Sequence, residues 1–208
     1  LSKNNIKVTQ RIVDLQSAMS IFHSALTTEN YDVPEGHYEE EQMKQTVVPN
    51  RNAIFASILY GYALSIATKK DTSIKIGLGV HSGDHEIYPD CRPEFYEALE
   101  HAFQVGNWDS KKVSFYLPYL EGDKETILRD SEKSLEKLSL DFNIIFANTN
   151  TSYNPDEQGR SSGKSGADIE RILAFNAIGR KDPVPYVDDW SKVLEHAIKI
   201  EKEHKEKI

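Results

Sequence analysis

The chain has 208 residues, of which 38% are hydrophobic and 28% are charged, and its formal net charge is -8. This composition is typical of a folded globular protein and excludes an intrinsically disordered chain. No stretch reaches the ~18 apolar residues that a membrane span needs, and no secretory signal pattern is visible. The acidic balance argues against a nucleic-acid-binding protein, because those rely on basic surfaces. A few local cations would still suffice to bind a small anion such as ATP.

The single cysteine, Cys91, excludes an intramolecular disulfide and favours a cytoplasmic location. The first residue is Leu1 rather than Met. We therefore expect a processed end, a truncation or an arbitrary boundary at the beginning of the chain.

The first predicted elements lie in the N-terminal half. Ile6 to Leu15 alternates weakly and predicts a short strand, and Thr27 to Gln45 predicts a long loop. Apolar residues recur at helical spacing from Arg51 to Thr68, with Asn50 as the expected N-cap. Ile74 to Val80 is short and rich in apolar residues, which is typical of a buried parallel strand.

The rest of the chain continues the alternation of helices and strands, which predicts an α/β fold with a parallel sheet. The predicted elements are a helix from Pro93 to about Val105, a strand from Val113 to Tyr119, a helix from Lys124 to Leu138 with Asp123 as its cap, a strand from Ile144 to Ala147, and helices from Ala167 to Ile178 and from Trp190 to Ile208.

Ligands of open α/β sheets bind beyond the carboxyl ends of the strands, so the loops at helix starts and strand ends are candidate sites. In the first such loop, Arg51 and Asn52 could hold an anion beside the backbone N–H groups of a helix start. The alternative is a helix cap with a solvent-exposed arginine, which spacing alone favours by roughly two to one.

The second loop runs from Gly79 to the helix that begins at Pro93. Asp84 and Asp90 could accept hydrogen bonds from the edge of a purine-like ring, Arg92 could pair with a carboxylate or phosphate, and Tyr88 or Phe95 could stack on a flat ring. The alternative is an ordinary turn whose carboxylates cap the following helix. The density of polar groups gives the two interpretations equal weight.

Two weaker signals complete the search. His81 could carry a proton or bind a metal, although a lone histidine more often does neither. Gly163-Lys164-Ser165 looks like the end of a phosphate-binding loop. The spacing excludes this, because such a loop needs a glycine five residues before its Gly-Lys pair.

Five blocks of sequence, taken together, resemble the 7-cyano-7-deazaguanine synthases of queuosine-precursor biosynthesis. The resemblance extends from Ile6 to Tyr186, and the Tyr-Pro-Asp-Cys-Arg-Pro-Glu-Phe block is specific by itself. The blocks are Asp32–Tyr38 (DVPEGHY), Val48–Asn52 (VPNRN), Tyr88–Phe95 (YPDCRPEF), Asn154–Arg160 (NPDEQGR) and Asp182–Tyr186 (DPVPY).

The resemblance implies a Rossmann-like parallel sheet of the adenine-nucleotide hydrolase (PP-loop ATPase) type. Residues 1–186 would form this domain, and residues 187–208 would form a C-terminal helix packed on it. It also implies a cytoplasmic homodimer that converts 7-carboxy-7-deazaguanine and ammonia to the nitrile. Such a ligase uses ATP with Mg²⁺, forms an adenylate and then an amide, and dehydrates the amide after a second activation.

The resemblance also implies two sets of binding residues. The residues expected around the deazapurine are Asp84, Tyr88, Asp90, Arg92, Glu94 and Phe95. The residues expected near the nucleotide are Arg51, Asn52, Gly79, His81 and Lys124. No catalytic residue is implied.

The chain departs from the family pattern in two places. It contains no Ser-Gly-Gly-x-Asp-Ser loop, so we expect the N-terminal strand and pyrophosphate loop to be missing. The family binds structural zinc through four cysteines, and the corresponding positions here are Ser152, Ser162, Ser165 and Asp168. Because hydroxyl groups are poor zinc ligands, we expect no zinc at this position. The loop would then be held by hydrogen bonds in place of metal bonds, or be looser.

These departures leave three interpretations open. The chain is a synthase or a fragment of one, a non-catalytic deazapurine-binding paralogue, or a divergent enzyme whose partner chain supplies the missing loop. The expected ligand is a 7-deazaguanine-type small molecule in all three.

Overall fold

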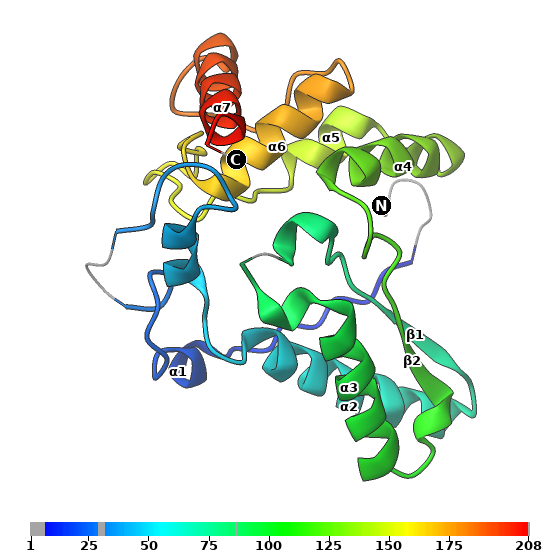
Figure 1. The fold of residues 1–208 in the computed structure, drawn as a ribbon. Helices are drawn as coiled ribbons and strands as arrows, with labels where there is room; N and C mark the ends of the chain where they lie inside the picture. Colours follow the sequence, from blue (N-terminus) through cyan, green and yellow to red (C-terminus); the bar gives the residue numbers. More distant parts are fainter. Residues whose placement is uncertain (1–6, 29–31, 86, 208) are drawn as a thin grey trace. The chain divides into compact units, whose positions relative to one another are not determined.

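The computed structural model describes residues 7–28, 32–85 and 87–207. The chain forms two compact units, which we call the central unit (Val48–Asp123) and the terminal unit (Leu1–Val47 with Lys124–Ile208). The terminal unit contains α1 (Gln16–Met19), the 3₁₀ helix η2 (Glu41–Thr46), α4 (Lys124–Lys137), α5 (Phe142–Ala147), α6 (Gly166–Ala177) and α7 (Trp190–Lys205). The central unit contains α2 (Arg51–Lys70), β1 (Ile74–Gly77), η3 (Ser82–Asp84), η4 (Pro89–Cys91), α3 (Pro93–Gly106), η5 (Ser110–Lys112) and β2 (Val113–Tyr116) (Figure 1).

The central unit is built on a parallel pair of strands. Ile74 of β1 lies opposite Val113 of β2, and Gly77 lies opposite Tyr116. The connection between these strands contains α3, as parallel pairing requires a long crossover. The structure therefore confirms an α/β chain with a parallel sheet. Both strands are shorter than predicted, because pairing stops at Gly77 and Tyr116.

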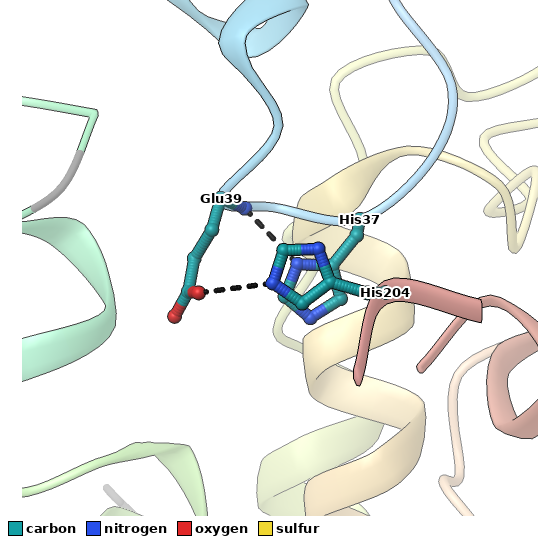
Figure 2. Close-up of side chains that lie close together, drawn as sticks. All are labelled: His37, Glu39 and His204. Atoms are coloured by element: carbon teal, nitrogen blue, oxygen red, sulfur yellow. Dashed lines mark hydrogen bonds and ion pairs between the residues drawn. The ribbon is translucent and has the colours of Figure 1, made fainter. Parts of the chain in front are cut away.

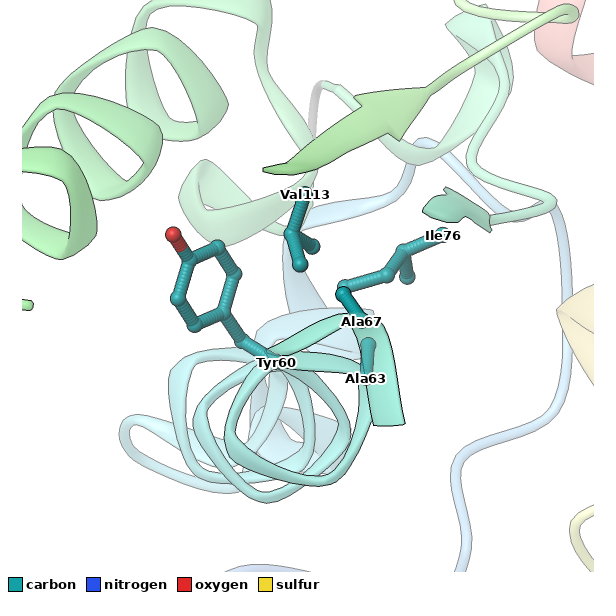
Figure 3. Close-up of a cluster of buried hydrophobic side chains, with 5 residues drawn as sticks. All are labelled: Tyr60, Ala63, Ala67, Ile76 and Val113. Atoms are coloured by element: carbon teal, nitrogen blue, oxygen red, sulfur yellow. The ribbon is translucent and has the colours of Figure 1, made fainter. Parts of the chain in front are cut away.

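The core of the central unit lies between α2 and the strands. Tyr60, Ala63 and Ala67 of α2 point toward Ile76 and Val113, and all five side chains are buried (Figure 3). The alanines have small side chains, so the helix backbone can lie close to the strands. Tyr60 also stacks on Phe103 of α3 with ring centroids 4.4 Å apart. This packing fixes α2, and with it the loop that precedes the helix.

The beginning of α2 differs from the prediction. Asn50 occupies the N-cap position but makes no side-chain capping hydrogen bond, and its φ is 61°. Asparagine tolerates this left-handed conformation better than most residues. Asn50 therefore turns the chain into the helix instead of capping it.

The terminal unit is held together by two apolar clusters. Ile169 and Ile172 of α6 pack with Val193 and Ala197 of α7. Leu128 of α4 joins Ala174 and Phe175 on another part of α6. Helix α6 is therefore the element on which α4 and α7 both pack. The predicted domain boundary between residues 186 and 187 stays a prediction.

Two predicted strands are wrong. Residues 144–147 belong to helix α5, whose first turn is capped by Asp141, because its carboxylate accepts a hydrogen bond from the Ile144 N–H at 2.8 Å. In the other case, Ile6 lies outside the described residues and residues 7–15 form no strand. Ile12, one of the apolar residues of that prediction, is 85% exposed, so no buried sheet face holds this segment.

The other predicted helices are confirmed to within a few residues, and α3 begins at Pro93 as expected. Ile208, the predicted end of the last helix, lies outside the described residues. The predicted loop from Thr27 to Gln45 contains the turn η2. Across the described ranges, no helix has the length and apolar character needed to cross a membrane.

Candidate functional site

Asn52, at the start of α2, is hydrogen-bonded to Asp90 and Cys91 of η4. The Asn52 backbone N–H donates to Asp90 Oδ2 at 3.2 Å, and Asn52 Nδ2 donates to the Asp90 carbonyl at 3.3 Å and to Cys91 Sγ at 3.2 Å. The sequence blocks around Asn52 and around Asp90 are therefore joined by hydrogen bonds. Asn52, which was expected near a nucleotide, connects the start of α2 to η4.

Arg51 lies beside Asn52 and covers an aromatic ring. Its guanidinium is 5.4 Å from the centroid of the Tyr88 ring, and its Nε donates to Asn52 Oδ1. Tyr88 is only 2% exposed. The Tyr88 ring therefore packs against the Arg51 guanidinium. Arg51 places a positive charge next to Asn52, which is hydrogen-bonded to Asp90.

Asp90 Oδ1 and His85 Nε2 are buried and have no hydrogen-bond partner among the described residues. Such atoms are uncommon in folded proteins, because an unsatisfied buried polar atom costs about 1–3 kcal/mol. Each is therefore a candidate to bond a ligand. Asp90 was predicted, whereas His85 was missed because a single histidine carries no spacing signal.

The loop after β1 is anchored to the loop after β2. The Ser82 backbone N–H and hydroxyl both donate to the Gly122 carbonyl, at 2.8 and 2.7 Å. Within the loop, the His81 N–H donates to Asp84 Oδ2 at 3.3 Å, and His81 Nε2 lies 3.6 Å from the same oxygen. His81 and Asp84 therefore contact each other, while Gly79 lies exposed just beyond β1.

The remaining predicted deazapurine residues lie at the start of α3. Arg92 is exposed, and its Nε donates to the His85 carbonyl at 2.8 Å. Phe95 is partly exposed and packs edge-on against Tyr96. Glu94 is exposed in the first turn of the helix. The central unit thus carries a cation, two carboxylates and a partly exposed aromatic ring within one short stretch of chain.

Cys91 lies within this stretch and Tyr96 directly follows it, and both side chains are buried. Desolvation by burial, followed by the charges of Asp84 and Asp90, raises the pKa of the Cys91 thiol to about 12. Burial also raises the pKa of Tyr96, with the Cys91 and Asp90 charges adding to the effect. The thiol therefore stays protonated at neutral pH, which does not suit a nucleophile.

Lys124 belongs to the terminal unit, unlike the other predicted nucleotide residues. Its ammonium pairs with Glu170 of α6 and lies 5.2 Å from the centroid of the Tyr38 ring. The contacts of Lys124 in the structure thus link α4, α6 and the segment around Tyr38.

The four positions at which the family pattern has cysteines meet at one carboxylate oxygen. Asp168 Oδ2 accepts hydrogen bonds from the hydroxyls of Ser152, Ser162 and Ser165, at 3.0, 2.9 and 2.9 Å. The Ser165 N–H also donates to this oxygen, and Asp168 is 1% exposed. We call these four residues the Asp168 knot. Three neutral hydroxyls, and one carboxylate that already accepts their hydrogen bonds, do not fit a structural zinc ion.

The Asp182–Tyr186 block also has a structural explanation. Arg171 of α6 forms a bidentate ion pair with Asp182, with Nε–Oδ2 and Nη2–Oδ1 distances of 2.5 and 2.9 Å. The Tyr186 hydroxyl and the Val184 N–H donate to the same carboxylate. Burial and then the Asp182 charge raise the pKa of the Tyr186 phenol. This network holds the segment between α6 and α7.

Sequence comparison assigns these blocks to a family. Residues 2–179 match the family described as Queuosine biosynthesis protein QueC. The chain belongs to the QueC family. It is 41% identical to the 7-cyano-7-deazaguanine synthase of Marinomonas sp. (strain MWYL1), over 86% of this chain and 74% of the relative.

Two further QueC-family relatives give similar values. The 7-cyano-7-deazaguanine synthase 1 of Colwellia psychrerythraea is 40% identical over 87% of this chain and 75% of the relative. The 7-cyano-7-deazaguanine synthase of Caldicellulosiruptor saccharolyticus is 40% identical over 90% of this chain and 76% of the relative. No solved structure matches the chain.

Proposed function

We propose that this chain is a 7-cyano-7-deazaguanine synthase that uses ATP with Mg²⁺ to convert 7-carboxy-7-deazaguanine and ammonia to the nitrile. The observation that carries the proposal is the buried Asp90 Oδ1, which has no hydrogen-bond partner in the described part of the chain and lies within the most specific family block. An open carboxylate oxygen suits the N–H donors of a guanine-like ring edge. The identity of about 40% to named synthases supports the same assignment.

In this proposal the central unit recognises the deazapurine. Asp90 accepts from the ring edge, Asp84 accepts from a second donor, and Phe95 packs against the ring face. Arg92 is exposed and pairs with the substrate carboxylate. Tyr88 and Glu94 complete the site, with Tyr88 supporting Arg51. His85 joins this set as a residue that hydrogen-bonds the substrate.

On the nucleotide side, Arg51 neutralises phosphate charge, and Asn52 keeps it beside Asp90. Gly79, His81 and Lys124 are the other proposed nucleotide contacts. ATP activates the carboxylate as an adenylate, ammonia displaces AMP to give the amide, and a second activation removes water. We further propose a cytoplasmic homodimer of the PP-loop ATPase type, in which the Asp168 knot stands where relatives bind zinc.

The test compares substrate binding in matched variants. An Asp90→Asn chain keeps an oxygen for the Asn52 N–H but turns an amide N–H₂ toward the ring donors. Binding of 7-carboxy-7-deazaguanine, measured by titration calorimetry, should weaken by about 10- to 100-fold, because a lost charged hydrogen bond costs ~1.5–3 kcal/mol. The control is Glu97→Gln, a carboxylate-to-amide change at an exposed position of α3, which should leave binding unchanged.

The alternative is a deazapurine-binding protein without synthase activity. It is favoured by the open Asp90 Oδ1, because this observation bears on deazapurine binding and not on ATP. Mass spectrometry of the products with ATP, Mg²⁺ and ammonium separates the two. Nitrile and AMP support the enzyme, whereas deazapurine binding without ATP binding or turnover supports the alternative. If neither ligand binds, both proposals are wrong.

A further inference from the structure

Two histidines and a glutamate from distant parts of the terminal unit meet at its surface. His37 and Glu39 lie on the segment before η2, and His204 lies in the last turn of α7. The two imidazole rings stack with centroids 3.6 Å apart and planes 8° from parallel (Figure 2). One potential ligand atom from each of the three residues lies within 4.8 Å of the others.

The segment that carries His37 and Glu39 is fixed to the start of α6. The Gly36 N–H donates to the Lys164 carbonyl at 3.1 Å, and Glu35 forms a β-bridge with Ser165. Gly166 has no side chain, and a Cβ atom there would come within 2.8 Å of Tyr38 Cα. Close packing against the start of α6 therefore fixes the position of this segment. This position places His37 next to His204.

Hydrogen bonds orient His37 as they orient many metal-bound histidines. Its Nδ1 accepts from the Glu39 N–H at 3.2 Å, so its proton is on Nε2, which donates to Glu201 at 3.0 Å. A carboxylate behind a histidine fixes the ring and raises the basicity of its other nitrogen. His37 Nδ1 and His204 Nε2 both face Glu39, and His204 Nε2 lies 3.2 Å from Glu39 Oε2 (Figure 2).

Charge and exposure also suit a cation. Two carboxylates, Glu39 and Glu201, surround two imidazoles, and the nearby Lys205 bonds the other oxygen of Glu201 at 2.7 Å. The His37 and His204 side chains are 13% and 14% exposed, whereas Glu39 is 44% exposed. An ion from solvent can therefore reach the nitrogen atoms from the side of Glu39.

We propose that His37, Glu39 and His204 bind one divalent transition-metal ion of the zinc class. Two imidazoles and a carboxylate suit Zn²⁺, Co²⁺ or Ni²⁺ better than Mg²⁺ or Ca²⁺, which prefer oxygen ligands. Tetrahedral zinc holds its nitrogen ligands at ~2.0–2.1 Å, hence roughly 3.4 Å apart. Imidazole lone pairs lie in the ring planes, which are only 8° from parallel, so one ring turns out of the stack when the ion binds. His37 Nδ1 then exchanges its hydrogen bond with the Glu39 N–H for the ion. A water molecule completes the four ligands.

This site goes beyond the proposed function. It uses none of the deazapurine or nucleotide residues and is separate from the Asp168 knot. His204 lies beyond residues 2–179, the range that matches the QueC family. The ion would join the segment before η2 to the end of α7, and so fix the C-terminal helix to the body of the terminal unit.

The test is a zinc titration of the full chain after treatment with a chelator and buffer exchange. We expect one ion per chain with a Kd below about 10 μM. Replacing zinc by Co²⁺ should give the visible absorption bands of a tetrahedral ion with nitrogen and oxygen ligands. His37→Gln, Glu39→Gln and His204→Gln should each weaken binding at least about tenfold, the scale on which ligand and supporting changes act.

His101→Gln is the matched control, because His101 is an exposed histidine on α3 of the central unit. Saturating zinc should raise the thermal midpoint of the wild-type and His101→Gln chains but not that of the three ligand variants. The proposal is overturned if the wild-type chain binds no zinc below about 100 μM, or if the ligand variants bind it as tightly as the control. The cobalt spectrum is recorded on the wild-type chain, so the test does not depend on the folding of any variant.

Discussion

At the scale of single residues, Asn52 joins two sequence blocks through its hydrogen bonds to Asp90 and Cys91. Arg51, Asn52 and Asp90 were expected in binding loops, and the structure brings them together. Spacing could not reveal that Asn52 uses its N–H and its side-chain amide to hold η4, because the contact joins residues 38 positions apart. Nor could it reveal the unsatisfied His85 nitrogen, which depends on burial in the folded chain.

The role of Asn52 can be tested without any ligand. Asn52→Ala removes the two hydrogen bonds that the side chain donates, to the Asp90 carbonyl and the Cys91 thiol, and the one that it accepts from Arg51 Nε. We expect the free energy of unfolding to fall by about 1–3 kcal/mol. Urea denaturation measures the change, and Asn143→Ala at an exposed position of α5 should stay within about 0.5 kcal/mol of wild type. Equal stability of the Asn52→Ala and Asn143→Ala chains would assign Asn52 no positioning role.

At the scale of elements, the long helices were predictable and the short segments were not. Helix α2 carries a sustained helical period, and Pro93 marks the first turn of α3. Residues 144–147 form an apolar run of only four residues, and such runs fit a strand or a helix equally well. The Asp141 cap decided between them. Asp141 is a capping residue that can be read in the sequence. Its hydrogen bond reaches only three residues along the chain, to Ile144, so it adds nothing to a periodic pattern.

The Asp168 knot makes a graded prediction at this scale. Ser162→Ala removes one hydroxyl that donates to Asp168, which should cost about 0.5–1.5 kcal/mol. Ser165→Ala should cost ~1 kcal/mol more, because the Ser165 hydroxyl also accepts from the Asp168 N–H and caps α6. Thermal or urea denaturation of the two variants gives the order. A Ser162→Ala chain less stable than Ser165→Ala would contradict this account of the cap.

At the scale of the whole molecule, both units bury acidic groups that stay protonated. Burial is the largest cause that raises the pKa of Cys91 and Tyr96 in the central unit and of Tyr186 in the terminal unit. An unfolded chain loses these protons near pH 8.5–10, the ordinary range of thiols and phenols. The folded chain keeps them to higher pH. The difference favours unfolding as the pH rises, so stability is full below about pH 8.5 and falls above it.

This predicts an alkaline limb in the stability profile. The free energy of unfolding should decrease above pH 9, by at most about 1.4 kcal/mol per pH unit for each such group. Tyr186→Phe removes one of these groups, so its profile should be shallower above pH 10 than that of the wild-type chain. Urea titrations between pH 8 and 11 provide the measurement. A flat wild-type profile would show that these protons are not retained by the fold.

The composition of the Asp168 knot has a consequence for the conditions that the protein can withstand. A cluster of thiolates around zinc is lost when peroxide oxidises the sulfur or when a chelator removes the ion. The Asp168 knot consists of three hydroxyl groups and one carboxylate, and neither reagent reacts with these groups. In this segment the fold rests on hydrogen bonds that oxidants and chelators leave intact.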